Sequence, residues 1–220
     1  MIFLYEIIGS TTVLLSTILS CLLLIKFHKL NDLLKVVGIY IIVGTSIDIV
    51  STALYQLQQS NLKFLHLFTL IEFVLLSYLF NALYAQHNSK FKLLYLAIPV
   101  TIFIIVNSIF IQDLNSFNSY STTLCSAVII GYCIHYFSLI LENQNQNIQF
   151  QTTKWFIITV FIIHCISLIV MLFGNFFYEV SQQAQSYIWS FRSLIIFSTK
   201  IILLYFFYKL LFNKSNVQPG

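Results

Sequence analysis

The sequence predicts an all-α membrane protein, a bundle of seven transmembrane helices. Of the 220 residues, 59% are hydrophobic and only 8% are charged, whereas soluble proteins carry about 25% charged residues. The apolar residues gather in seven runs, and each run is close to the ~20 residues that a helix needs to cross a bilayer. The runs are apolar on all sides, whereas the strands of a membrane β-barrel are about half as long and alternate in polarity.

Short polar segments separate the seven runs. We expect the first run to be a retained helix and not a cleaved signal peptide, because no Lys or Arg precedes it. The fourth run contains Pro99, and an Asn- and Gln-rich segment at 142–151 precedes the sixth. We expect one transmembrane domain over 1–212 and a short cytoplasmic tail over 213–220. The expected helices cover residues 3–27, 34–57, 64–84, 91–111, 120–141, 155–178 and 188–212.

The basic residues predict the orientation, because cytoplasmic loops of membrane proteins are enriched in Lys and Arg. With the N-terminus outside, eight lysines lie on the cytoplasmic side and Lys63 alone lies outside. We therefore expect a cytoplasmic C-terminus and a location in a bacterial inner membrane. Basic residues that stand singly at helix ends indicate contact with the lipid bilayer and no nucleic-acid partner. The eight cytoplasmic lysines are Lys26, Lys29, Lys35, Lys90, Lys92, Lys154, Lys209 and Lys214.

Ionisable residues within the runs are the candidate functional residues. Each costs at least about 2.5 kcal/mol at the centre of a bilayer, so such residues normally face the protein interior and have a function. We expect a pocket open to the outside, in which acids of the first three helices meet cations of the last helix. Direct ion pairs that only hold the helices together are the alternative interpretation. The predicted pocket residues are Glu6, Asp48, His66, Glu72, Arg192 and Lys200.

Helical spacing indicates which faces carry these groups. On the first helix, Ser10, Thr17 and Cys21 continue the line of Glu6 and predict a polar face. The second helix has a longer polar stripe, which should also point into the protein. This stripe consists of Gly44, Thr45, Asp48, Ser51, Thr52 and Tyr55.

Lys200 suggests a cofactor. A buried lysine can form a Schiff base, and the protonated imine needs a counter-ion such as Asp48 or Glu72. Seven helices, an outside N-terminus and a lysine in the last helix form a layout similar to that of microbial rhodopsins, and this resemblance implies a retinal pigment. The retinal-flanking tryptophans of that family are absent from the third helix, and the sixth has only Trp155 at its start. In addition, Ile196 stands where that family has an Asp, one turn before the lysine.

Two histidines suggest a different cofactor. His135 and His164 lie on consecutive helices, and facing imidazoles can hold a b-type haem. One histidine per helix and the lack of a second pair disfavour this hypothesis. The four cysteines lie inside apolar runs without metal-ligand spacing, so we expect them to be small apolar residues.

The segment 66–73, with the sequence HLFTLIEF, is the most distinctive string of the chain. With its aromatic-rich helices flanked by Lys and Asn, the chain resembles uncharacterised seven-helix membrane proteins of AT-rich bacteria. This resemblance implies a location in the membrane and no particular activity.

The sequence lacks the phosphate-binding glycine loop, the zinc-protease motif and the nucleophile elbow. No acid–histidine set at one depth is expected either, so we predict that the protein is not an enzyme. We expect a sensor or a subunit of a membrane complex, with a membrane-protein partner or as a homo-oligomer. The alternatives are a retinal protein linked through Lys200 and an ion- or proton-coupled transporter that uses Asp48 and Glu72.

Overall fold

The computed structural model describes residues 2–87, 93–116, 118–141, 147–173 and 182–212, and in this part of the chain all regular structure is helical. The side chains at 2–6, 55, 94 and 182–185 lie outside this description. The expected tail at 213–220 lies outside it too. The helices are α1 (Ile2–Lys26), α2 (Asp32–Gln56), α3 (Leu62–Gln86), α4 (Leu94–Val106), α5 (Ser119–Ile140), α6 (Ile148–Leu172) and α8 (Gln182–Phe212). Two short elements, the 3-10 turn η1 (Phe27–Lys29) and the π-helix η2 (Asn107–Ile111), follow α1 and α4.

The helices have the length and composition of membrane spans, which confirms the predicted class of helical membrane protein. In the described residues, six helices are long and apolar enough to cross a bilayer, and a shorter apolar helix covers Tyr95–Ile111. The shorter one consists of α4 and η2, which together measure about 27 Å at the α-helical rise. The hydrocarbon core of a bilayer is about 30 Å thick.

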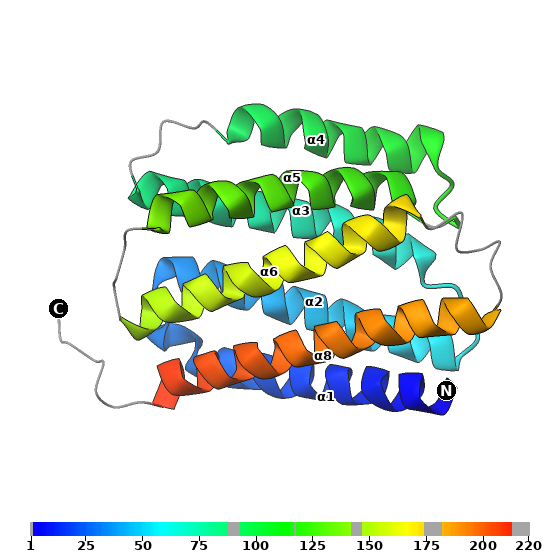
Figure 1. The fold of residues 1–220 in the computed structure, drawn as a ribbon, viewed down its shortest axis with the longest axis horizontal. Helices are drawn as coiled ribbons and strands as arrows, with labels where there is room; N and C mark the ends of the chain where they lie inside the picture. The colour runs from blue at the N-terminus through cyan, green and yellow to red at the C-terminus, as the bar shows by residue number, and fades with distance from the viewer. Residues whose placement is uncertain (1, 88–92, 117, 142–146, 174–181, 213–220) are drawn as a thin grey trace.

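Six helices form a closed ring. Each packs against the next in the order α1, α2, α3, α5, α6 and α8, and α8 packs back against α1. The helix α4 lies outside this ring, against α3 and α5 (Figure 1). The ring therefore has an interior that five or more helices can line, and α4 contributes only to its outer layer.

The two ends of the bundle differ in charge. We call the end at which α1 begins the N-terminal end and the opposite end, where α8 finishes, the C-terminal end (Figure 1). Among the described residues, Lys63 lies at the N-terminal end, at the start of α3. The lysines of the C-terminal end are Lys26, Lys29, Lys35, Lys154 and Lys209. The C-terminal end, which holds most of these lysines, is the end that the sequence predicts to be cytoplasmic.

Apolar side chains fill the interior and also cover the outside. Phe73, Phe80 and Phe156 are fully buried between helices, while Ile102 and Ile134 belong to a large set of exposed apolar residues. In water such an apolar surface would promote aggregation, whereas in a bilayer it contacts the lipid chains. The outer surface of the ring is therefore suited to lipid.

The face of α1 that points inward differs from the expected one. Ser10 and Cys21 are exposed, so the predicted polar line through Ser10, Thr17 and Cys21 is wrong. The buried polar residue Ser20 donates a 2.8 Å hydrogen bond to Thr45 Oγ1 of α2. Small polar residues let two helix backbones approach closely, and this contact decides which face of α1 turns inward.

Most helix boundaries agree with the expected ones to within two residues, but the start of α4 differs by three residues and the starts of α6 and α8 differ by more. The sixth helix was expected at 155–178 and begins instead at Ile148, and the last was expected at 188 and begins at Gln182. The polar start of α6 is stabilised by its N-cap, because the side chain of Asn147 accepts a hydrogen bond from the Gln149 N–H. The expected stretch 174–178 lies outside the described residues.

Candidate functional site

A polar cavity of about 420 Å³ lies inside the ring. Residues from α2, α3, α5, α6 and α8 line it, together with Asn61 and Asn118, which precede α3 and α5 at the N-terminal end. Twelve of its twenty lining residues have polar side chains. These polar residues are Tyr40, Asp48, Ser51, Asn61, Thr69, Glu72, Asn118, Thr122, His164, Ser167, Arg192 and Lys200.

Four of the six predicted pocket residues line this one cavity. Asp48 of α2 and Glu72 of α3 contribute carboxyl groups, and Arg192 and Lys200 of α8 contribute the cations. The side chain of Glu6 lies outside the described residues. The structure thus brings together the acids and cations of helices that are far apart in sequence.

Glu72 is held between two neighbours. Its side chain is only 16% exposed, and its Oε1 accepts a 2.9 Å hydrogen bond from the Tyr40 hydroxyl of α2. The same oxygen lies 3.8 Å from Nε2 of His164 on α6. A buried carboxyl group needs such partners, because burying an unpaired polar group is costly.

His164 joins the cavity to the wall between α5 and α6. Its Nδ1 lies 3.2 Å from the hydroxyl of Ser126, which is 0% exposed. This contact fixes the ring so that Nε2 faces Glu72. Among the described residues, Tyr40, Glu72, His164 and Ser126 therefore lie in one row across α2, α3, α6 and α5, in which the Glu72–His164 step of 3.8 Å is longer than a hydrogen bond.

The structure bears on two statements made about His164. Ser126, its neighbour on α5, precedes His135 by nine residues, or about 14 Å of helix, so the two imidazoles do not face one another as ligands of one haem. An acid–histidine pair at one depth, which was not expected, exists as Glu72 and His164. The pair was missed because the start of α6 was placed seven residues too late, and that shift moves His164 by about 10 Å along the helix axis.

The polar stripe of α2 divides into two parts. Gly44, Asp48 and Ser51 line the cavity. Thr45 turns toward α1, and Thr52 donates to the Asp48 carbonyl of its own helix. None of these five residues is exposed, so the predicted inward direction holds for them, although only three of them line the cavity. The side chain of Tyr55 is outside the description.

The two cations of α8 lie at different depths. Arg192 is closer to the N-terminal end by eight residues, or about 12 Å, and its guanidinium lies 5.7 Å from the centre of the Trp189 ring. Lys200 lies deeper. No carboxylate of a described residue is within 4.0 Å of the Lys200 Nζ.

His66 lies outside the cavity, although it was predicted to belong to the pocket. Its Nε2 is 3.2 Å from the Ser116 carbonyl oxygen, and its Nδ1 is 3.1 Å from the Ser108 hydroxyl of η2. Because a carbonyl oxygen only accepts, Nε2 carries the hydrogen. His66 thus holds α3 against the segment that connects α4 to α5. Nearby, Asn118 Nδ2 donates to Thr69 Oγ1 at the cavity wall.

Sequence reasoning missed Tyr40, although a signal for it exists. Tyr40 precedes Gly44 by one helical turn, so it extends the stripe of α2 by one step. The sequence does not predict that Asn61 and Asn118 line the cavity, because their positions depend on how the residues before α3 and α5 pack in the folded protein.

The described residues contain no group of three or more His, Cys, Asp or Glu that could hold a metal ion. Ser126 contacts His164 but is buried away from the cavity, so it is not placed as a nucleophile. The chemistry that the cavity offers is the binding of charged groups of both signs. No family model matches the chain, and neither the curated proteins nor the solved structures include one that is significantly similar to it.

Proposed function

We propose that this protein is a non-enzymatic membrane receptor whose cavity binds a small molecule with both a positive and a negative group. One observation supports the proposal above the others: carboxyl groups of two helices and cations of a third line the same cavity. The ligand's cationic group would bind at Asp48 and Glu72, and its anionic group at Arg192 or Lys200.

The same observation weighs against a purely structural role for the charges. Ion pairs that hold helices together require direct contact between the partners. Among the described residues of the cavity, however, the only pair within 4.0 Å is Glu72 with His164, at 3.8 Å. Lys200 and Asp48 face the same space without touching one another. A bound ligand would supply charged partners for Asp48 and Lys200.

Such a receptor has two ways to act. It can report occupancy of the cavity as a sensor, or it can serve as a subunit of a membrane complex through a membrane-protein partner or a second copy of itself. We place it in a bacterial inner membrane with the N-terminal end of the bundle outside, so that the cavity is reached from the outer side.

Ligand-dependent thermal stability tests the proposal. The purified protein would be heated with phosphoethanolamine, with an α-amino acid, and with ammonium and phosphate as single-charge controls. A ligand that binds only the folded state raises the melting temperature in proportion to the logarithm of its excess over Kd. We expect the zwitterions to stabilise the protein more than either single ion, and D48N and K200Q to lose that gain. Equal stabilisation of these variants and the parent protein would contradict the proposal.

Proton-coupled transport is the second candidate, and the row from Tyr40 through Glu72 and His164 favours it. Side chains that gain and lose protons inside a membrane commonly form such relays. Proteoliposomes that contain a pH-sensitive dye would report proton movement when phosphoethanolamine is added outside. E72Q should abolish the signal if transport is the function, and an unchanged internal pH with the parent protein would exclude it.

The retinal hypothesis remains testable at Lys200, which lines the cavity. Ligand pockets for large apolar molecules are lined mainly by hydrophobic and aromatic side chains, whereas twelve of the twenty residues that line this cavity have polar side chains. An absorption spectrum after the addition of all-trans retinal decides the point. A visible band that K200A removes would establish the Schiff base, and a colourless mixture would exclude it.

A further inference from the structure

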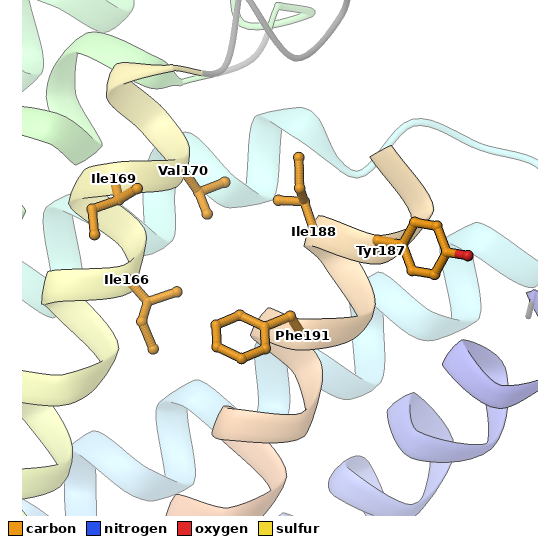
Figure 2. A pocket seen from close by; sticks show the side chains of 6 residues that line it. All are labelled: Ile166, Ile169, Val170, Tyr187, Ile188 and Phe191. Carbon is orange, nitrogen blue, oxygen red and sulfur yellow. The ribbon is translucent and has the colours of Figure 1, made fainter. Parts of the chain in front are cut away.

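A second hollow lies between α6 and α8, and it is apolar. It has a volume of about 350 Å³, and Figure 2 shows side chains of both helices around it. We call it the α6–α8 groove. Its lining residues are Ile166, Ile169 and Val170 of α6 and Tyr187, Ile188 and Phe191 of α8.

The groove exists because α6 and α8 diverge. Near the C-terminal end of the bundle, the rings of Trp155 and Phe206 stack with centres 5.2 Å apart and join the two helices. Toward the N-terminal end, α6 runs away from α8 (Figure 1). Ile169 and Phe191 are more than half exposed there, so the groove opens on the surface that is suited to lipid.

The groove and the polar cavity lie on adjacent faces of the same two helices. On α6, Ile166 lines the groove and Ser167 lines the cavity. On α8, Phe191 lines the groove and Arg192 lines the cavity. Consecutive residues of a helix point about 100° apart. Only the width of the α6–α8 seam therefore separates the cavity that holds the charged groups from the apolar groove.

We propose that the ligand is a zwitterionic amphiphile of the bilayer, with its head group in the cavity and its hydrocarbon chain in the α6–α8 groove. This inference rests on the proposed function and names the ligand class and its route of entry. A groove lined only by apolar side chains and tyrosine can bind a hydrocarbon chain. It has almost no polar groups that could bind a water-soluble ligand. The cavity presents two carboxyl groups and two basic groups, so a head group with one charge of each sign matches it better than an anionic one.

Chain length and head group can be varied separately to test this. Binding to the purified protein in a maltoside detergent would be measured by native mass spectrometry. The probes are phosphoethanolamine, lysophosphatidylethanolamine, and two lipids with the same single chain, lysophosphatidylglycerol and monoacylglycerol. We expect lysophosphatidylethanolamine to bind at least roughly tenfold more tightly than phosphoethanolamine, because its chain adds van der Waals contacts in the groove and holds it in the detergent micelle beside the protein. It should also bind more tightly than the anionic and the uncharged lipid.

Two substitutions on α8 separate the groove from the rest of the surface. I188W fills the groove, and the matched control L194W adds the same side chain at an exposed residue that does not line it. We expect I188W to bring lysophosphatidylethanolamine down to the affinity of phosphoethanolamine and to leave the latter unchanged, whereas L194W should alter neither. I166S, which makes the groove more polar without filling it, should weaken only the long-chain probe.

The outcomes distinguish the two proposals. If both ethanolamine probes bind equally and I188W has no effect, the amphiphile is excluded while the receptor for a small zwitterion stands. If the long-chain lipids bind irrespective of head group and K200Q changes nothing, the groove takes up any lipid chain, and the amphiphile inference is wrong. If neither ethanolamine probe binds the parent protein, both proposals fail.

Discussion

Glu72 shows how a single residue is made tolerable inside the bundle. Its carboxyl group is removed from most of the solvent, and one of its oxygens contacts Tyr40 and His164. In a medium of low dielectric constant, such contacts are stronger than in water, and their loss is correspondingly costly. The environment of Glu72 is therefore set by side chains from two other helices.

Substitution of Tyr40 by Phe tests this arrangement. The change removes the 2.9 Å hydrogen bond to Glu72 and keeps the aromatic ring, which packs edge-on against Phe156. We expect the free energy of unfolding to fall by about 1–3 kcal/mol, because a buried acceptor loses its donor. Thermal or SDS-induced unfolding in detergent measures the change. Y78F, at an exposed tyrosine of α3, should be neutral; a comparable loss in both variants would contradict the interpretation.

At the level of the helices, the pattern of charged and hydrophobic residues predicted where the helices lie in the sequence but not where all of them begin. A run of apolar residues marks where a helix crosses lipid, and α1, α2, α3 and α5 end within two residues of the expected positions. The start of α6 carries Gln, Thr and Lys, which also occur in loops. Thr152 is nevertheless completely buried, with its hydroxyl donating to the Ile148 carbonyl. Composition cannot reveal that local bond, so the helix was predicted too short at this end.

The same limit applied to the site. Asp48, Glu72, Arg192 and Lys200 could be assigned to one pocket from their depth and spacing, because charges in lipid must turn inward. The position of His164 depended on a helix boundary. His66 lies outside the pocket because it contacts Ser108 of η2. The pattern of apolar residues in the sequence does not predict a π-helix.

The π-helix η2 yields a prediction at Asn107. This residue is 0% exposed, and its Nδ2 donates to Gln112 Oε1 and Ser121 Oγ at 2.9 and 2.8 Å. We expect N107A to lower the free energy of unfolding by about 1–3 kcal/mol, since buried partners lose their donors. Single-turn π-helices often occur at functional sites, so ligand binding should be measured beside stability. I109A removes an exposed apolar side chain of the same segment and serves as the control; if it destabilises the protein equally, the polar contacts are not the cause.

For the whole molecule, we propose one topology from the connectivity and the charges. The helix α3 finishes at the C-terminal end and α5 starts at the N-terminal end, so α4 with η2 must run from one end to the other (Figure 1). Although shorter than the other six, this segment would make the seventh crossing. An odd number of crossings puts the two termini on opposite sides. We propose, from the lysines at the C-terminal end, that this end is the cytoplasmic one.

Cysteine labelling in intact cells tests this topology. Asn115 is exposed between η2 and α5 at the N-terminal end, and His28 is exposed in η1 at the C-terminal end. We expect a membrane-impermeant maleimide to label N115C in intact cells and to label H28C only after permeabilisation. The native cysteines lie within helices, two of them buried, so they should add little background; the unsubstituted protein measures it. Labelling of H28C in intact cells, with N115C protected, would reverse the orientation and place the mouth of the cavity at the cytoplasmic surface, where the ligand would have to come from the inner leaflet.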